Sequence, residues 1–335
     1  MGLPIDRQRP IPSPALAPAA SEFERTDEAG LTIALINNMP DSALKATERQ
    51  FMRLVQIAAG ERRVRFHCFA LPSVTRSKQA KEHIDKDYTD ISEIDRLQID
   101  GLIVTGAEPI VPTLPEERYW REFTGLVEWA KTNTRSTIWS CLAAHAAVLH
   151  LDGIERQRLA QKCSGIYDCA RVAADWLTSG LSRSIKVSHS RLNEVRENDL
   201  GPRGYRILTR SEQAGVDIFA RDFESRFIFF QGHPEYDDHS LQREYMRDIA
   251  RFLTGEREQY PAVPASYFDA ETEEVLANFE QHARTERKPE IAAELPGLTL
   301  RPDVPSGGTA TTIFRNWLDF LGADARALSS ETVRR

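Results

Sequence analysis

The stretch RSTIWSCLAAHAAVLH, residues 135–150, decides the fold of this chain. Residues 136–139 are mostly β-branched or aromatic and favour a buried strand, whereas residues 142–149 are rich in alanine and leucine and favour a helix. Cys141 lies at the junction. Its side chain is expected at the carboxyl edge of a sheet, above a helix N-terminus whose free N–H groups stabilise a thiolate or an oxyanion. Cys141 is therefore a candidate nucleophile; a buried cysteine that packs as a small hydrophobe is the alternative.

The segments on both sides of this stretch alternate between strand and helix patterns in the same way. Strands are predicted at residues 31–36, 64–70, 101–104 and 226–230. Helices are predicted from about residue 47, at 116–133 and at 240–253. Further short strands are predicted at 162–167, 184–194, 205–208 and 215–220. This alternation predicts an α/β fold, a three-layer, doubly wound and mostly parallel sheet with helices on both faces.

The domain organisation follows from changes in composition along the chain. Residues 1–29 are rich in proline and alanine and lack periodicity, which predicts a disordered or loosely docked N-terminal tail. Residues 30–255 are predicted to form the catalytic domain. Residues 256–335 are a C-terminal extension, in which an apolar helix at about 311–321 is expected to dock back on the core.

Composition excludes several classes of partner. The net charge of -7 argues against a nucleic-acid surface, which needs a clustered basic face. No apolar run approaches the roughly 18 residues that span a bilayer, and the N-terminus lacks a signal pattern, so no membrane partner is expected. The four cysteines lack the paired spacing of a zinc site or a disulfide scaffold, which predicts no metal and a reduced, cytoplasmic setting. The oligomeric state stays open, with a homodimer as one candidate.

A second group of chemically active side chains follows the strand predicted at 226–230. His233 and Glu235 flank Pro234 directly after it. Ligands bind at the carboxyl ends of strands in open α/β sheets, so Cys141 and His233 are both expected on the same edge. A cysteine nucleophile needs a base, and the base needs a third group that orients its ring, a role that suits Glu235. An ordinary surface turn is the alternative, but the joint placement favours a catalytic pair.

Several motifs then point to a known family. They are Asn38-Met39-Pro40 with Thr47-Glu48, Gly101 to Ala107, Tyr119-Trp120, Ser136-Thr137 with Cys141, Lys162 with Ser164-Gly165, His189-Ser190-Arg191, Gly232 to Asp237, and Glu244 with Arg247-Asp248. In this order and spacing, the chain resembles the homoserine O-acyltransferase family, which makes O-succinyl- or O-acetylhomoserine for methionine synthesis. The resemblance runs from about Leu31 to Asp248 and resumes weakly at 314–318. It implies a class I glutamine-amidotransferase-like (flavodoxin-like) fold.

The resemblance also implies a mechanism and a set of site residues. Cys141 would accept the acyl group from acyl-CoA, His233 would act as general base and Glu235 as its catalytic companion, in a ping-pong reaction. Three residues match substrate-contacting positions of the family: Lys162, Ser190 and Arg247. Acyl-CoA is then a co-substrate, the amino acid is a second small-molecule substrate, and no cofactor is implied. The oxyanion donors are expected to be the N–H after Cys141 and one from residues 36–38.

Three parts of the chain depart from the family pattern: the acyl-selecting position, residues 142–145, and the region after Tyr267-Phe268, which lacks the family's usual Trp-Arg-Ser-His segment. At the acyl-selecting position, where the family carries Gly for succinyl and Glu for acetyl, the chain has Ile110. A bulky side chain there would shorten the acyl pocket and favour acetyl, but it lacks the charge that repels succinate, so the donor stays open. His145 stands where the family usually has Gln, and is expected either as a second ring in the site or, more simply, as a helix-packing residue.

Three other functions compete with homoserine acyl transfer. L-Serine is one methylene shorter than homoserine, a difference worth only about 1–3 kcal/mol in a pocket, so serine O-acyltransfer for cysteine biosynthesis stays open. Glutamine hydrolysis shares the fold and the Cys/His-x-Glu layout, but Ser140 and Leu142-Ala143 replace the glycines of the usual elbow. A catalytically inactive binding or regulatory protein is disfavoured, because the chain keeps Cys141, His233, Glu235 and Arg247 together.

Overall fold

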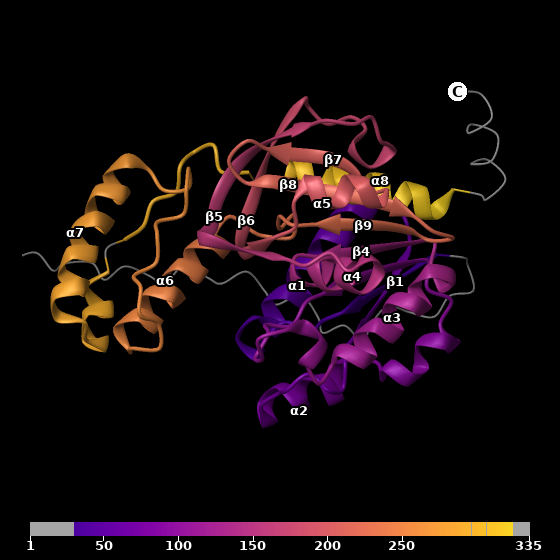
Figure 1. Cartoon of the computed structure of the whole chain (residues 1–335), viewed down its shortest axis with the longest axis horizontal. Helices are drawn as coiled ribbons and strands as arrows, with labels where there is room; N and C mark the ends of the chain where they lie inside the picture. The colour runs from indigo at the N-terminus through magenta and orange to yellow at the C-terminus, as the bar shows by residue number, and fades with distance from the viewer. Residues whose placement is uncertain (1–29, 296, 306, 324–335) are drawn as a thin grey trace, which may run out of the picture.

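The structure, a computed structural model, describes residues 30–295, 297–305 and 307–323 (Figure 1). The tail predicted at residues 1–29 lies outside the described residues. A three-layer α/β body holds the central sheet, and a helical unit projects to one side of it. Within the described ranges, no helix combines the length and the apolar character that a bilayer crossing requires.

Five parallel strands form one half of a nine-stranded sheet, in the order β2-β1-β3-β4-β9. They are β1 (Leu31–Ile36), β2 (Val64–Phe69), β3 (Gly101–Thr105), β4 (Ser136–Ser140) and β9 (Arg226–Phe230). β3, β4 and β9 are buried along their whole length, which explains why all their side chains except that of Arg226 are apolar or small. This is the strand order of flavodoxin-like sheets, and the prediction of a doubly wound α/β fold is confirmed.

The other half of the sheet is antiparallel and continues from β9 in the order β8-β7-β5-β6. Its strands are β5 (Gln157–Arg171), β6 (Ser184–Glu194), β7 (Arg206–Ser211) and β8 (Gly215–Asp222). The predicted parallel character therefore holds up to β9 and then changes. β5 is much longer than the strand expected at 162–167, because its first residues are largely exposed and carry no apolar signal.

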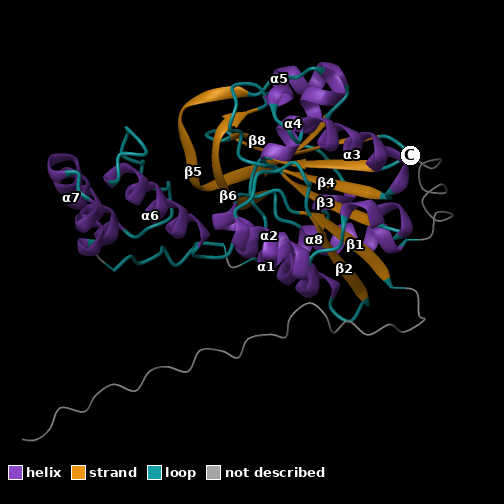
Figure 2. Ribbon diagram, turned by 90° about the horizontal axis from the view of Figure 1, so that it is seen from below, coloured by secondary structure: helices purple, strands orange, loops and turns teal. Residues whose placement is uncertain are grey.

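Helices cover both faces of the parallel half (Figure 2). On one face lie α1 (Asp41–Ala59) and α8 (Gly308–Gly322), whose apolar side chains form a core with β1, β3 and β4. On the other lie α3 (Trp120–Asn133) and α4 (Leu142–Asp152), which pack against Trp139 of β4 and Phe227 and Phe229 of β9. α8 returns from the C-terminal extension to contact α1, where the rings of Phe51 and Phe314 lie 6.3 Å apart.

α1 begins at Asp41, six residues before the start expected at Thr47. Pro40 occupies the N-cap, and its carbonyl accepts the N–H groups of Ala43 and Leu44 at 2.8 and 2.9 Å. Proline has the φ angle of a helix and lacks only the N–H that a first turn leaves unbonded, so it starts a helix well. The polar first turn drew the prediction toward the later Thr47-Glu48.

A second, smaller core lies outside the sheet (Figure 1). α6 (Ser240–Leu253) and α7 (Ala270–Glu286) enclose apolar side chains that include Tyr245, Tyr267, Phe268 and Leu276. α6 begins shortly after the His233 turn, so one of its ends lies close to the carboxyl edge of the sheet. A further helix, α2 (Lys78–Asp87), lies between β2 and β3 in the chain and has a single buried residue, Ala80.

Candidate active site

Cys141 lies on a sharp turn between β4 and α4. It is the N-cap of α4, with φ 51° and ψ −107°, and is partly exposed. A positive φ is strained for any residue with a Cβ, and such strain is typical of functional turns. The Cys141 N–H donates to the carbonyl of Phe230 in β9, at 2.7 Å. The thiol is thereby held at the N-terminus of a helix, in the strand–turn–helix arrangement of nucleophile elbows.

The loop after β3 packs closely against this elbow. A Cβ added to Gly106 would lie 2.3 Å from Leu142 Cβ and 2.6 Å from the Ala143 backbone nitrogen. Only glycine allows the approach, which brings the Gly106 backbone next to the first turn of α4. The loop therefore forms one wall of the space above Cys141.

His233 reaches the same place because β4 and β9 are parallel neighbours. Ser140 and Phe230 are paired, so the residues that follow them leave the sheet side by side. The His233 N–H donates to Ser188 O at 2.8 Å, and its Nδ1 lies 2.8 Å from Glu235 Oε1. The expectation that Cys141 and His233 lie on one edge agrees with this topology, and Glu235 has the contact of an orienting group.

The electrostatics at His233 favour the protonated imidazolium. Burial alone would lower the pKa of His233, but the charges of Glu235 and of the Cys141 thiolate raise it well above its ordinary value. Its Nε2 has no regular hydrogen-bond partner among the described residues and is turned to the thiol of Cys141. The imidazole is thus oriented on one side and unoccupied on the side that faces the sulfur.

Two of the three predicted substrate-binding residues meet at α6. Lys162 Nζ lies 3.3 Å from Glu244 Oε2 and 2.9 Å from Asp248 Oδ2, and Ser190 donates its hydroxyl to Glu244. Burial raises the pKa of Glu244, but Lys162 and Ser190 outweigh this and lower it to about 2. A charged carboxylate therefore gathers these polar groups from β5 and β6.

Tyr236 connects this group to the catalytic turn. Its hydroxyl donates to Glu244 Oε1 at 2.7 Å, and its ring stacks on the His233 imidazole with centroids 4.2 Å apart. The predicted binding residues and the predicted base thus belong to one continuous network. Neither Tyr236 nor Glu244 had an assigned role in the sequence analysis, although the Glu244/Asp248 spacing puts two acids on one helix face and could have drawn attention.

Arg247, the third predicted binding residue, lies on the same helix. Its Nη2 is 3.5 Å from Asp248 Oδ1, its Nε is buried without a hydrogen-bond partner in the described residues, and its side chain is 35% exposed. The guanidinium therefore keeps donors free for a ligand.

Ile110 and His145, which both depart from the family pattern, differ in their surroundings. The Ile110 side chain is 73% exposed, and its N–H donates to Glu117 Oε1 at 2.6 Å. Its role in acyl selection stays a prediction. His145 is fully buried, with Nε2 2.9 Å from Gln231 Oε1, so it is a packing residue of α4. Burial lowers its pKa to about 3 and keeps the ring neutral.

The prediction that residues 36–38 supply an oxyanion donor is wrong for Asn37 and for Asn38. Asn37 donates its N–H to Phe69 O and Asn38 donates to Thr105 Oγ1, both at 2.8 Å. These bonds tie the end of β1 to its neighbours, so neither N–H is free. The N–H of Leu142, the residue after Cys141, lies in the first turn of α4, where backbone donors have no partner within the helix.

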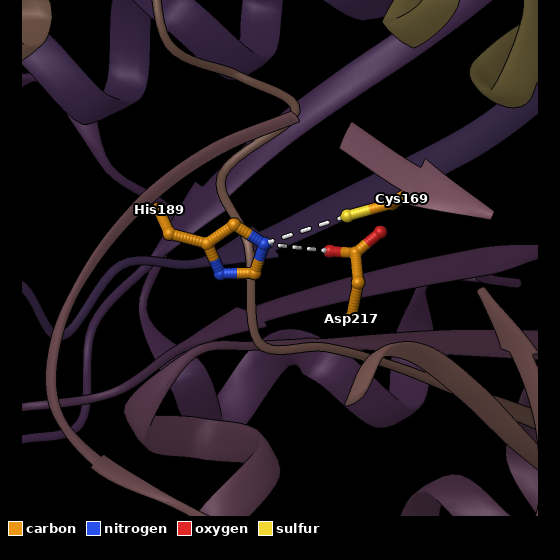
Figure 3. A group of neighbouring side chains, drawn as sticks. All are labelled: Cys169, His189 and Asp217. Carbon is orange, nitrogen blue, oxygen red and sulfur yellow. Dashed lines mark hydrogen bonds and ion pairs between the residues drawn. The ribbon is translucent and has the colours of Figure 1, made fainter. Parts of the chain in front are cut away.

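A second set of thiol, imidazole and carboxylate groups lies among the antiparallel strands (Figure 3). His189 Nε2 is 4.0 Å from Cys169 Sγ and 3.5 Å from Asp217 Oδ1. All three residues are fully buried, and their ligand atoms lie within 4.8 Å of one another, so they could hold a metal ion. Burial raises the pKa of the Cys169 thiol, so it is not a nucleophile.

A thiol at a strand–helix elbow, with an imidazole–carboxylate pair on the next strand of an α/β sheet, defines a class of cysteine-dependent group-transfer or hydrolytic enzymes. A family model described as homoserine O-succinyltransferase matches residues 16–291. Homoserine O-succinyltransferases of Bradyrhizobium japonicum and Rhodopseudomonas palustris are 61% and 55% identical to the chain. The alignments cover 96% and 97% of this chain and 99% and 100% of those proteins. The chain belongs to the homoserine O-succinyltransferase family.

Solved structures that resemble the chain are more distant. A glutamine amidotransferase from Thermotoga maritima is 12% identical, with a TM-score of 0.49 over 88% of this chain and 100% of that chain. One from Methylobacillus flagellatus is 13% identical, with a TM-score of 0.49 over 88% of this chain and 96% of that chain. At this distance the likeness carries no argument about activity.

Proposed function

We propose that the protein transfers a succinyl group from succinyl-CoA to the hydroxyl of L-homoserine, through an acyl-enzyme on Cys141. The observation that carries this proposal is the placement of the Cys141 thiol at the N-terminus of α4, opposite the free Nε2 of His233. The names of the relatives support succinyl as the transferred group and homoserine as the acceptor.

In the first half-reaction the Cys141 thiolate attacks the thioester carbon of acyl-CoA. A bond forms between Sγ and that carbon, the bond to the CoA sulfur breaks, and CoA leaves as a thiol with the proton of the His233 imidazolium. One thioester replaces another, so the protein contributes mainly positioning and stabilisation of the oxyanion. We assign the oxyanion to the N–H of Leu142 and to the backbone of Gly106 in the loop that packs against it.

In the second half-reaction the acceptor hydroxyl attacks the acyl-enzyme. His233 takes the hydroxyl proton as the new C–O bond forms, the C–Sγ bond breaks, and the thiolate–imidazolium pair returns. Glu235 holds the ring throughout. The free guanidinium donors of Arg247 suit the acceptor carboxylate, and the charged Glu244 network, which contacts His233 through Tyr236, suits its amino group.

A thiol-release assay tests this function by crossing two donors, succinyl-CoA and acetyl-CoA, with two acceptors, L-homoserine and L-serine. We expect the largest kcat/KM for succinyl-CoA with homoserine. A preference for acetyl-CoA would overturn the donor, and a preference for serine would overturn the acceptor. Ammonia release from glutamine without any thiol release would replace the proposal with amidohydrolysis. No turnover in either assay would favour an inactive binding protein.

A further inference from the structure

Arg156 is a partly buried cation near the nucleophile that forms no ion pair with any carboxylate of the described residues. It lies in the short connection between α4 and β5. Its Nη1 is buried and has no hydrogen-bond partner within the described ranges. A buried donor without a partner costs about 1–3 kcal/mol, and more when the group is charged. Such a group needs an explanation, and an absent anionic ligand is a direct one.

The surroundings of Arg156 connect it with the catalytic thiol. Burial lowers the pKa of the guanidinium, while the charges of Tyr119, Glu117 and Cys141 act on it in the opposite direction. Tyr119 does not neutralise it, because burial and Glu117 raise the pKa of its hydroxyl to about 12. Arg156 therefore remains a cation within electrostatic reach of the nucleophile.

Glu117, the nearby carboxylate, is occupied elsewhere. Its Oε1 accepts the N–H groups of Ile110 and Val111 at 2.6 and 3.1 Å, and the residue is buried. These bonds hold the loop after β3, the same loop that packs against the elbow through Gly106. Glu117 thus fixes a wall of the site and forms no ion pair with Arg156.

We propose that Arg156 binds the free carboxylate of the succinyl group while its carbonyl carbon is at Cys141. This assignment rests on the proposed function. A succinyl group carries a carboxylate two methylenes beyond the reacting carbonyl, and a guanidinium binds a carboxylate through two parallel hydrogen bonds. The other cations at the site have other roles: Lys162 pairs with Glu244 and Asp248, and Arg247 is assigned to the carboxylate of the acceptor. An acetyl group has no carboxylate for Arg156, so this residue would favour succinyl donors.

The test compares two donors in the thiol-release assay with homoserine: succinyl-CoA, and butyryl-CoA, which has the same four-carbon chain without the carboxylate. Arg156→Met should lower kcat/KM for succinyl-CoA by roughly 10- to 100-fold, the loss expected for a charge-assisted hydrogen bond. For butyryl-CoA the same variant should stay within about 3-fold of the wild type, because that donor makes no such bond. Arg156→Lys keeps the charge and should restore part of the succinyl-CoA activity.

Arg158→Met is the matched control. It removes the charge of an exposed side chain two residues away, and kcat/KM for both donors should stay unchanged. An equal loss with both donors in Arg156→Met would place the guanidinium on the CoA portion or in a structural role, and an undiminished succinyl-CoA activity would show no role in binding. Either result overturns the assignment while the proposed function stands. A wild-type protein that releases no thiol from succinyl-CoA would instead overturn the proposed function.

Discussion

The protein contains two sets of a thiol, an imidazole and a carboxylate, and their surroundings give them opposite chemistry. In the first, at the end of the parallel strands, Cys141 is partly exposed at a helix N-terminus. In the second, among the antiparallel strands, Cys169 is fully buried and lies near the C-terminal end of β5 (Figure 3). The residue types are nearly the same, so the difference comes from position in the fold.

The two histidines show this difference most directly. The pKa of His233 is raised well above its ordinary value because Glu235 and Cys141 act on it as anions. The pKa of His189 is lowered well below its ordinary value, because burial and the repulsion of nearby cations both disfavour the charged ring. Position in the fold therefore decides whether the imidazole of such a set favours its charged or its neutral form.

The largest expected effect separates the two thiols. Cys141→Ser should lower the thiol-release activity by roughly 10³-fold or more, since the nucleophile is lost. Cys169→Ser should stay within about 3-fold of the wild type, because that sulfur contacts no substrate. Mass spectrometry after incubation with succinyl-CoA alone should show one succinyl adduct on the peptide that contains Cys141. An adduct on Cys169, or full activity in Cys141→Ser, would contradict the assignment of Cys141 as the nucleophile.

A smaller effect is expected from the carboxylate that orients the base. Glu235→Gln should lower kcat by roughly 10- to 1,000-fold, because the ring loses its charged partner. The His233 pKa, measured by NMR titration of the imidazole, should fall in the variant, since the Glu235 charge is what raises it most. Asp238→Asn is the matched control, because it removes an exposed carboxylate three residues away. An unchanged His233 pKa in Glu235→Gln would contradict the contact between His233 Nδ1 and Glu235 Oε1.

Asp217, the carboxylate of the buried set, is expected to lower the stability of the protein when it is ionised. Burial raises the pKa of Asp217 to about 6, above the ordinary 3.8, so its ionised form opposes folding at neutral pH. Asp217→Asn keeps an acceptor for Thr209 and should raise the free energy of unfolding by about 2 kcal/mol at pH 7.5. The gain should shrink by roughly 1 kcal/mol at pH 5.5, where the native carboxyl binds a proton. Denaturant titrations at both pH values measure this; a destabilised variant at pH 7.5 would show a paired charge instead.

The smallest effect concerns His145, the buried ring behind the nucleophile. Its pKa is lowered to about 3, so the unfolded chain binds a proton below pH 6.5 that the native state excludes. Stability from this residue is fully present above pH 6.5 and is lost as the pH falls, by about 1 kcal/mol at pH 5.5. His145→Gln keeps a donor for Gln231 and should lack this loss. Melting temperatures of both proteins at pH 7.5 and 5.5 test the difference; parallel declines would contradict it.

The sequence predicted the parallel half of the sheet well because its strands are buried and their apolar runs end in turn residues. The same reasoning placed Cys141 and His233 on one edge, since parallel strands end together. β5 was underestimated, because a long, partly exposed antiparallel strand carries a weak pattern. The predicted start of α1 was too late, because Pro40 caps the helix, which begins six residues before the polar Thr47-Glu48.

The surroundings of the catalytic pair were harder to predict. The network of Lys162, Ser190 and Glu244 depends on how β5, β6 and α6 approach one another, which no local pattern specifies. Arg156 gave no signal at all, because an arginine before a strand usually faces solvent. Its significance comes from the burial of Nη1 and from the absence of a hydrogen-bond partner for that atom in the described residues.

The backbone at Cys141 has one further consequence. A φ of 51° is comfortable for glycine and costs a residue with a Cβ about 1–3 kcal/mol. Replacing this cysteine by glycine should therefore raise the melting temperature of the protein while it removes the nucleophile. A screen for thermostable variants that measures only the melting temperature would therefore select an inactive protein at this position. Stability and activity place opposite demands on residue 141.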